Sequence, residues 1–292
     1  FQKCFFSVLS FFVRELFKNV SFQFLVFSFE SFSKMFYLYS FDDALIKIYF
    51  LLWDVDKHLK GLGTSKAPME AQTEILLRRF PKIDITCIDL SENQLESARR
   101  SLSNVAHANG RYDIKKMDAT DMDFESQTFD GAFLCWVLEH VPDPNKVLSE
   151  VRRVCRSGSV VYITEVLNSS FFLEPYSPNV WKYWMAFNDY QYDMKGDPFI
   201  GAKLGNILMQ QGYRDIKVET KTWHLDNRRP GKRKEFIDFW TQLLLSASEQ
   251  LIKDDYIDEE TVKKARAELK NVSNDPNAVF YYSFIQAKAK VY

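Results

Sequence analysis

From residue 66 onward, strand-like and helix-like segments alternate along the chain. Residues 83–88 (IDITCI), 129–136 (FDGAFLCW) and 159–166 (SVVYITEV) are short and largely apolar. Asp143, which is followed directly by a proline, marks the start of the helix that separates the last two runs. Such alternation is typical of an α/β domain with a parallel sheet whose central strands are buried on both faces.

Turn and capping residues divide the rest of the chain. Ser91 with Gln94 three residues later has the spacing of a capping box. We expect the helix that follows Asp143 to end at Gly158. The remaining expected elements are helices at 70–80, 91–102 and 200–211, a mostly helical region at 230–272, and strands at 112–116, 214–225 and 278–291.

Composition changes sharply near the front of the chain. Of the 26 phenylalanines, 14 lie in the first 53 residues, and the first 60 residues contain neither glycine nor proline. We therefore expect three parts: a Phe-rich segment at 1–65, a core at 66–168, and the aromatic and helical remainder of the same domain at 169–292.

Four interpretations of the segment 1–65 stay open. They are a buried helical cap, a helix on a membrane surface, a secretory leader, and misassembled sequence. The longest uncharged runs, 4–13 and 19–29, are shorter than the roughly 18–20 residues that span a bilayer. Membrane contact of 1–53 is therefore not the favoured interpretation.

Charge and cysteine usage narrow the classes of partner. The net charge of −1 disfavours binding to nucleic acid through bulk electrostatics, so no nucleic-acid partner is expected. The four cysteines are far apart and form no C-x-x-C, which disfavours a metal site or a disulfide framework. We therefore expect a cytoplasmic protein.

Polar residues follow the expected strands. In a doubly wound sheet, ligands bind outside the carboxyl ends of the strands. Asp89 there could accept hydrogen bonds from both hydroxyls of a ribose, or could be a surface residue beside a helix. Asp118 could accept from an adenine amino group or could form a turn. His140 suits a general base, although local packing is the commoner role; Glu165 and His224 are further candidates for a base.

The connecting region at 169–195 is rich in aromatic residues. These could line an apolar pocket as a lid, or could form the core of a helical cap. Trp181 and Trp184 are three residues apart and would share one face of a helix, so they are the candidates for binding a substrate. The full set is Phe171, Phe172, Tyr176, Trp181, Tyr183, Trp184, Phe187, Tyr190 and Tyr192.

The ordered set of segments resembles the class I S-adenosylmethionine-dependent methyltransferases. IDITCIDLSENQLESAR resembles the second strand and following helix of that family, and MDATDM through SVVYITE resembles the run from its adenine-contacting Asp to its fifth strand. VLEHVPDP resembles the small-molecule branch that methylates ubiquinone and menaquinone precursors. The resemblance implies a doubly wound, Rossmann-like, seven-stranded sheet with an antiparallel last strand and inserted helices. It implies S-adenosylmethionine as the cofactor and the following residues around it: Asp89 and Leu90 at the ribose, Asp118 and Ala119 at the adenine, and Cys135 and Trp136 at the methionine end.

One stretch departs from the family pattern. Where the family has a glycine-rich loop after its first strand, this chain has KAPME at 66–70. Glycines there let the backbone approach the cofactor closely. Either cofactor binding is weakened, or the true first strand and loop are missing from this sequence, which is the interpretation that we favour. The chain also offers an apolar strand candidate at 46–52, with an unusually long connection after it.

Three functions follow as hypotheses. The first is methyl transfer to a small-molecule acceptor. The second is a catalytically silent, methyltransferase-like binding protein, because of residues 66–70. The third is a nicotinamide-dependent dehydrogenase, which is disfavoured because no G-x-G-x-x-G lies about 20 residues before Asp89.

Overall fold

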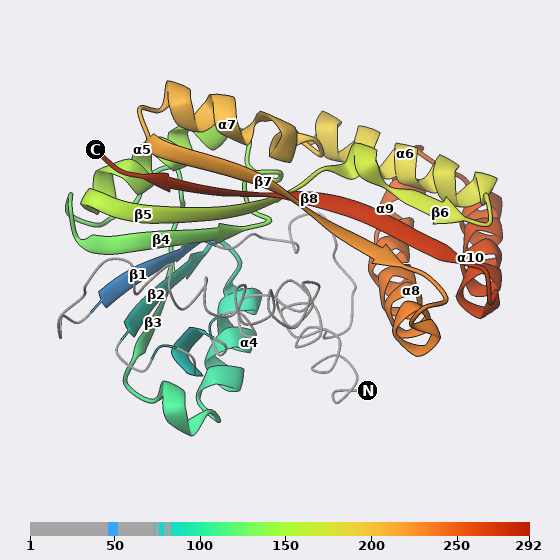
Figure 1. Cartoon of the computed structure of the whole chain (residues 1–292), viewed down its shortest axis with the longest axis horizontal. Helices are drawn as coiled ribbons and strands as arrows, with labels where there is room; N and C mark the ends of the chain where they lie inside the picture. The colour runs from blue at the N-terminus through green and yellow to red at the C-terminus, as the bar shows by residue number, and fades with distance from the viewer. Residues whose placement is uncertain (1–45, 52–72, 74–75, 79, 81–82) are drawn as a thin grey trace.

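A computed structural model describes residues 46–51, 73, 76–78, 80 and 83–292 (Figure 1). The described residues do not include the Phe-rich segment, apart from 46–51, or the stretch 66–70. The four interpretations of the segment 1–65 and the expectation for 66–70 therefore stay predictions. The strands are β1 (Ile46–Leu51), β2 (Ile83–Asp89), β3 (Tyr112–Lys116), β4 (Phe129–Cys135), β5 (Cys155–Val166), β6 (Phe172–Glu174), β7 (Arg214–Leu225) and β8 (Val279–Lys290). The helices are α4 (Glu92–Leu102), α5 (Pro144–Val154), α6 (Pro178–Asp193), α7 (Ile200–Gln210), α8 (Pro230–Leu245), α9 (Ser248–Lys253) and α10 (Glu259–Asn274), with short 3₁₀ turns at Ala106–Ala108 and Asn168–Ser170.

The strands form one sheet in the order β3-β2-β1-β4-β5-β8-β6, and β7 pairs with the other edge of β8. Strands β1 to β5 are parallel, whereas β8 runs antiparallel to β5, β6 and β7. The chain reverses its direction of winding at β1, which lies between β2 and β4. The predicted doubly wound sheet with an antiparallel last strand is therefore confirmed, and the strand candidate near residue 46 is part of it.

Helices cover both faces of the sheet. Alternate residues of β2 point to opposite faces: Ile83 and Ile85 pack into a cluster with α4, and Ile88 packs into a second cluster with α5 and α7. Figure 1 shows α4 below the sheet and α7 above it. The second cluster is built on the apolar stripe of α5, and Asp143 caps that helix by accepting from the Lys146 N–H at 3.0 Å.

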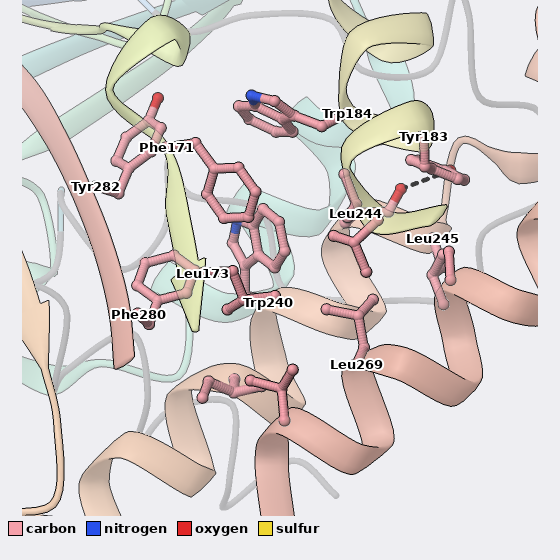
Figure 2. Close-up of a cluster of buried hydrophobic side chains, with 14 of the residues drawn as sticks. Phe171, Leu173, Tyr183, Trp184, Trp240, Leu244, Leu245, Leu269, Phe280 and Tyr282 are labelled. Atoms are coloured by element: carbon pink, nitrogen blue, oxygen red, sulfur yellow. Dashed lines mark hydrogen bonds between the residues drawn. The ribbon is translucent and has the colours of Figure 1, made fainter. Parts of the chain in front are cut away.

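A helical lobe lies beyond the carboxyl ends of the parallel strands. We use this name for α6, α8, α9 and α10 with β6 and the parts of β7 and β8 that they cover; these elements gather at the right of Figure 1. Its core is aromatic: Phe171 stacks on Trp240 with ring centroids 4.6 Å apart, and Figure 2 shows these two rings at the centre of the cluster. The Tyr183 hydroxyl donates to the Leu244 carbonyl at 2.7 Å and joins α6 to α8. None of the described helices is long and apolar enough to cross a membrane.

Two details differ from expectation. The sheet has an eighth strand, β6, because its three residues continue along the edge of β8 that β5 occupies. In addition, α5 ends at Val154 and not at Gly158. Cys155 already pairs with Phe129 of β4, and Gly158, with a φ of +88°, donates its N–H to Val291. The glycine therefore shapes the beginning of β5 and does not end the helix.

Candidate functional site

The carboxyl ends of β2 and β4 flank the end of β1. Leu51 is the last residue of β1, and it pairs with Ile88 on one side and with Leu134 on the other. The next residues along the two neighbours are Asp89 and Cys135. The fold therefore brings these two predicted cofactor residues to one edge of the sheet, on either side of the strand at which the winding reverses. Such a switch point is where ligands bind in open α/β sheets.

Asp89 is held in place at this edge. It is 2% exposed, and its Oδ1 accepts from the Ser91 N–H at 2.8 Å. Its backbone carbonyl accepts from the Met117 N–H at 3.0 Å, which ties the end of β2 to the residue after β3. Ser91 in turn caps α4, as the sequence predicted, with Oγ 3.5 Å from the Gln94 nitrogen. Asp89 is thus a buried and oriented carboxylate, unlike the surface residue that was the alternative.

Asp118 lies two residues beyond the end of β3. Lys116 is the last residue of β3 and pairs with Asp89. The Asp118 side chain is exposed, and its Oδ1 accepts from the N–H and the hydroxyl of Thr120, both at 2.8 Å. Asp118 therefore forms the predicted turn, and its role beside an adenine stays a prediction. Ala119 is half-buried and Leu90, the residue directly after β2, is 39% exposed; their roles beside a cofactor also stay predictions.

The turn that follows β4 has an unusual backbone and a buried carboxyl group beneath it. Trp136 has a φ of +56°, and its N–H donates to the Thr164 carbonyl of β5 at 2.8 Å. Glu165, which is fully buried, accepts from three consecutive N–H groups: Oε1 from Val137 at 3.0 Å and Leu138 at 2.9 Å, and Oε2 from Glu139 at 3.3 Å. The oxygens of this candidate base are therefore engaged with the backbone.

His140 is hydrogen-bonded through both ring nitrogens. Nε2 lies 3.2 Å from Oε1 of Glu139, and Nδ1 lies 3.1 Å from Nε2 of Gln191 on α6. If Nδ1 accepts from Gln191, the ring proton is on Nε2 and is donated to Glu139. The neutral ring then has no lone pair left for a substrate, which favours the local role over that of a general base.

His224 lies apart from this group of side chains. It is on β7, its side chain is 51% exposed, and its neighbours are Asp226, with an N–O distance of 3.7 Å, and the Tyr281 ring. Trp223, the preceding residue, points into the aromatic core. The structure therefore brings Glu165 and His140 together and places His224 elsewhere.

The aromatic residues of 169–195 divide into three sets. Phe171, Tyr183, Trp184 and Tyr190 are buried in the core of the helical lobe, Trp181 and Phe187 are half-buried against it, and Phe172, Tyr176 and Tyr192 are exposed. The Trp184 indole N–H donates to the Asn168 carbonyl at 3.1 Å. Trp184 is thus packed in this core, whereas one side of the Trp181 ring stays accessible to solvent. The role of either ring in binding an acceptor stays a prediction.

Sequence reasoning missed the groups that join the helical lobe to the turn after β4. Gln191 donates to the side-chain Oε2 of Glu139 at 3.0 Å and contacts the carbonyl of the same residue at 3.2 Å. The Asp197 N–H donates to this carbonyl at 2.7 Å. In the sequence, Glu139 and His140 stand out because they are polar residues that follow an apolar strand. Gln191 gave no signal, because it lies 52 residues away in the chain.

Comparison with protein families decides the identity of this fold. Residues 69–163, which are less than half of the chain, match the family model described as "Methyltransferase domain". The match includes β2, β3, β4 and the first part of β5, and it ends before Glu165. This part of the chain is similar to the class I S-adenosylmethionine-dependent methyltransferases.

Curated methyltransferases match parts of the chain. A phosphatidylethanolamine N-methyltransferase of Cereibacter sphaeroides is 34% identical over 82 residues, which is 28% of this chain and 40% of that protein. A chloroplastic 2-methyl-6-phytyl-1,4-hydroquinone methyltransferase of Oryza sativa subsp. japonica is 28% identical over 134 residues, 45% of this chain and 36% of the relative. The chain therefore spans less than half the length of these two relatives.

Solved methyltransferase structures share the fold at low identity. A putative methyltransferase of Bacillus halodurans superposes with a TM-score of 0.50 at 13% identity, covering 89% of this chain and 98% of the other. The Haemonchus contortus phosphoethanolamine N-methyltransferase 2, solved with S-adenosylhomocysteine, gives a TM-score of 0.50 at 16% identity and covers 90% and 53%. These likenesses support the methyltransferase fold.

S-adenosylmethionine is the methyl donor of this family. The described residues fit it at the ribose, because Asp89 presents a buried, oriented carboxylate at the switch point, and ribose hydroxyls are donors that suit such a group. The stretch 66–70, where the family has its glycine loop, lies outside the described residues. The fit therefore rests on the ends of β2, β3 and β4.

The stability of this protein should depend on Glu165. Burial and the neighbouring Glu139 carboxylate raise the pKa of Glu165 from 4.5 to about 8, against the lowering effect of the three N–H donors. Between these values the folded chain keeps a proton that the unfolded chain releases, so the free energy of unfolding should fall as the pH rises from about 4.5 to about 8. Urea unfolding at several pH values in this window should show this fall, and Glu165→Gln should flatten it. An unchanged slope in the variant would contradict the assignment.

Proposed function

We propose that this chain transfers the methyl group of S-adenosylmethionine to a small-molecule acceptor. The observation that carries the proposal is the placement of Asp89 and of the Cys135-Trp136 turn on either side of the end of β1. Asp89 would hold the ribose, Asp118 and Ala119 would border the adenine, and Cys135 and Trp136 would border the methionine end.

For this reaction the protein mainly has to align the methyl donor with the acceptor and to exclude water from between them. The bound donor supplies a methyl group on a positively charged sulfur, which is open to in-line attack. Side chains that hold the donor and acceptor in one geometry can then provide most of the acceleration. We assign no general base, because the oxygens of Glu165 and the ring nitrogens of His140 are engaged inside the protein.

Two features support a small-molecule acceptor. The relatives named above act, by their names, on phosphatidylethanolamine and on a hydroquinone that carries a phytyl chain, and others are O-methyltransferases. The helical lobe lies beyond the strand ends and offers the partly buried ring of Trp181. An apolar or planar small molecule suits such a surface.

A methyl-transfer assay tests the proposal. The purified chain would be incubated with S-adenosylmethionine labelled on its methyl group and with separate pools of hydroquinones, phenols and amines. We expect label in the products of at least one pool. Cofactor binding with no transfer to any pool would favour the catalytically silent protein that residues 66–70 suggest. Binding of NAD in place of S-adenosylmethionine would favour a dehydrogenase.

The two tryptophans of α6 should respond differently to substitution. Trp184→Leu should lower the free energy of unfolding by about 1–3 kcal/mol, because it removes buried ring contacts and leaves the Asn168 carbonyl without its indole donor. Trp181→Leu is the matched variant: it should lower acceptor turnover while cofactor affinity stays within a few-fold. Chemical unfolding and steady-state kinetics check the two effects. A loss of stability in Trp181→Leu as large as that in Trp184→Leu would show that both rings are core.

A further inference from the structure

The turn after β4 needs something to hold its shape. It begins at Trp136, whose φ of +56° lies in a region that residues with a bulky side chain seldom adopt. The next three residues, Val137 to Glu139, present consecutive N–H groups, and the His140 N–H closes the turn on the Val137 carbonyl at 3.0 Å. Buried N–H groups without acceptors would oppose this backbone, so an acceptor beneath the turn is required.

Glu165 meets this requirement from the neighbouring strand. Its two oxygens accept from all three N–H groups, at 3.0, 2.9 and 3.3 Å, and the residue is fully buried at the end of β5. A carboxyl oxygen accepts hydrogen bonds whether the group is ionised or neutral, whereas an amide NH₂ only donates. The position therefore suits Glu and disfavours the isosteric Gln, which would aim a donor at the Glu139 N–H.

The opposite side of the turn is held by the connection between α6 and α7. The Glu139 carbonyl accepts from the Asp197 N–H at 2.7 Å, and Gln191 contacts the same carbonyl. A Cβ at Gly196 would lie 2.6 Å from that oxygen, so the packing there leaves no room for a side chain. The turn is thus clamped between β5 and the helical lobe.

We propose that Glu165 is a positioning residue that fixes the turn 136–140 in the form that borders the methyl end of the cofactor. The proposal rests on the proposed function, because it assumes that this turn meets S-adenosylmethionine. Glu165 itself touches only the protein: it acts through the backbone of the turn, not on the reacting atoms.

The test compares two glutamates whose carboxylates each accept hydrogen bonds from consecutive backbone N–H groups. Glu268 on α10 accepts from the Asn179 and Val180 N–H groups at the start of α6, at 2.9 and 3.0 Å, so Glu268→Gln is the matched control in the helical lobe. In Glu165→Gln, hydrogen exchange of the amides of 137–139 should accelerate at least about tenfold, while the β5 amides at 160–164 stay protected. S-adenosylmethionine affinity should fall at least about tenfold in Glu165→Gln and stay within about twofold in Glu268→Gln.

The outcomes separate this inference from the proposed function. Normal exchange at 137–139, or equal loss of cofactor affinity in both variants at matched loss of stability, would overturn the positioning role. Normal affinity in Glu165→Gln alongside binding by the unchanged protein would overturn it as well, and would leave the proposed function standing. Failure of the unchanged protein to bind S-adenosylmethionine would overturn the proposed function, and with it the role of the turn at the cofactor.

Discussion

Gly201→Ala should destabilise the fold by about 1–3 kcal/mol or more, the cost of forcing an atom into a packed interior. Gly201 is the second residue of α7 and is buried where this helix crosses the end of β5. A Cβ there would press against the Val166 carbonyl more closely than a carbon and an oxygen can approach, and it would also lie 3.1 Å from the Glu165 carbonyl and 3.0 Å from Ile285. Because these neighbours are mostly backbone of the central sheet, the helix itself must move.

Urea unfolding measures this loss, and Gly231→Ala is its matched control. Gly231 is also in a helix, α8, but it is exposed and a Cβ there meets nothing within 4 Å. Its replacement should leave stability unchanged or raise it by up to about 1 kcal/mol, since alanine favours helix. Equal effects of the two substitutions would show that α7 does not pack on β5 as described.

Asp89→Ala should weaken S-adenosylmethionine binding by about 1.5–3 kcal/mol, which is roughly 10- to 150-fold. The reason is the loss of charge-assisted hydrogen bonds to the ribose. The same change also removes the acceptor of the Ser91 N–H, so Asp89→Asn is the more selective variant. It keeps an oxygen for Ser91 while removing the charge, and it should weaken cofactor binding with little change in melting temperature.

Asp84→Asn is the control on the same strand. Asp84 lies near the beginning of β2, at the edge of the sheet opposite Asp89. Its substitution should leave cofactor affinity unchanged in titration calorimetry. Normal binding by both Asp89 variants would show that the ribose assignment is wrong.

Much of the fold could be predicted from local signals. Asp143 with its following proline, and Ser91 with Gln94, set the starts of α5 and α4, and the apolar runs of β4 and β5 required burial on both faces. The predicted position of Asp89 at a strand end needed only the end of an apolar run. Such features depend on residues within a few positions of each other, which is why they can be recognised in the sequence.

The parts that escaped prediction depend on distant contacts. Gly158 has the features of a helix end, yet Cys155 pairs with Phe129 and begins a strand before the glycine is reached. Glu165 had the features of a base at a strand end, yet its partners are backbone groups 26 to 28 residues earlier. Every residue except proline has a backbone N–H, so the sequence does not show which of them a side chain will bind. Gln191 meets Glu139 only because α6 folds back over the end of the sheet.

The central claim is that the edge formed by the ends of β2 and β4 binds S-adenosylmethionine. Titration calorimetry of the unchanged protein, with S-adenosylmethionine and NAD in parallel, tests it most directly. The account predicts saturable binding of S-adenosylmethionine, no binding of NAD, and clearly weaker S-adenosylmethionine binding by Asp89→Asn. Binding of NAD alone, or S-adenosylmethionine binding that does not depend on Asp89, would contradict it.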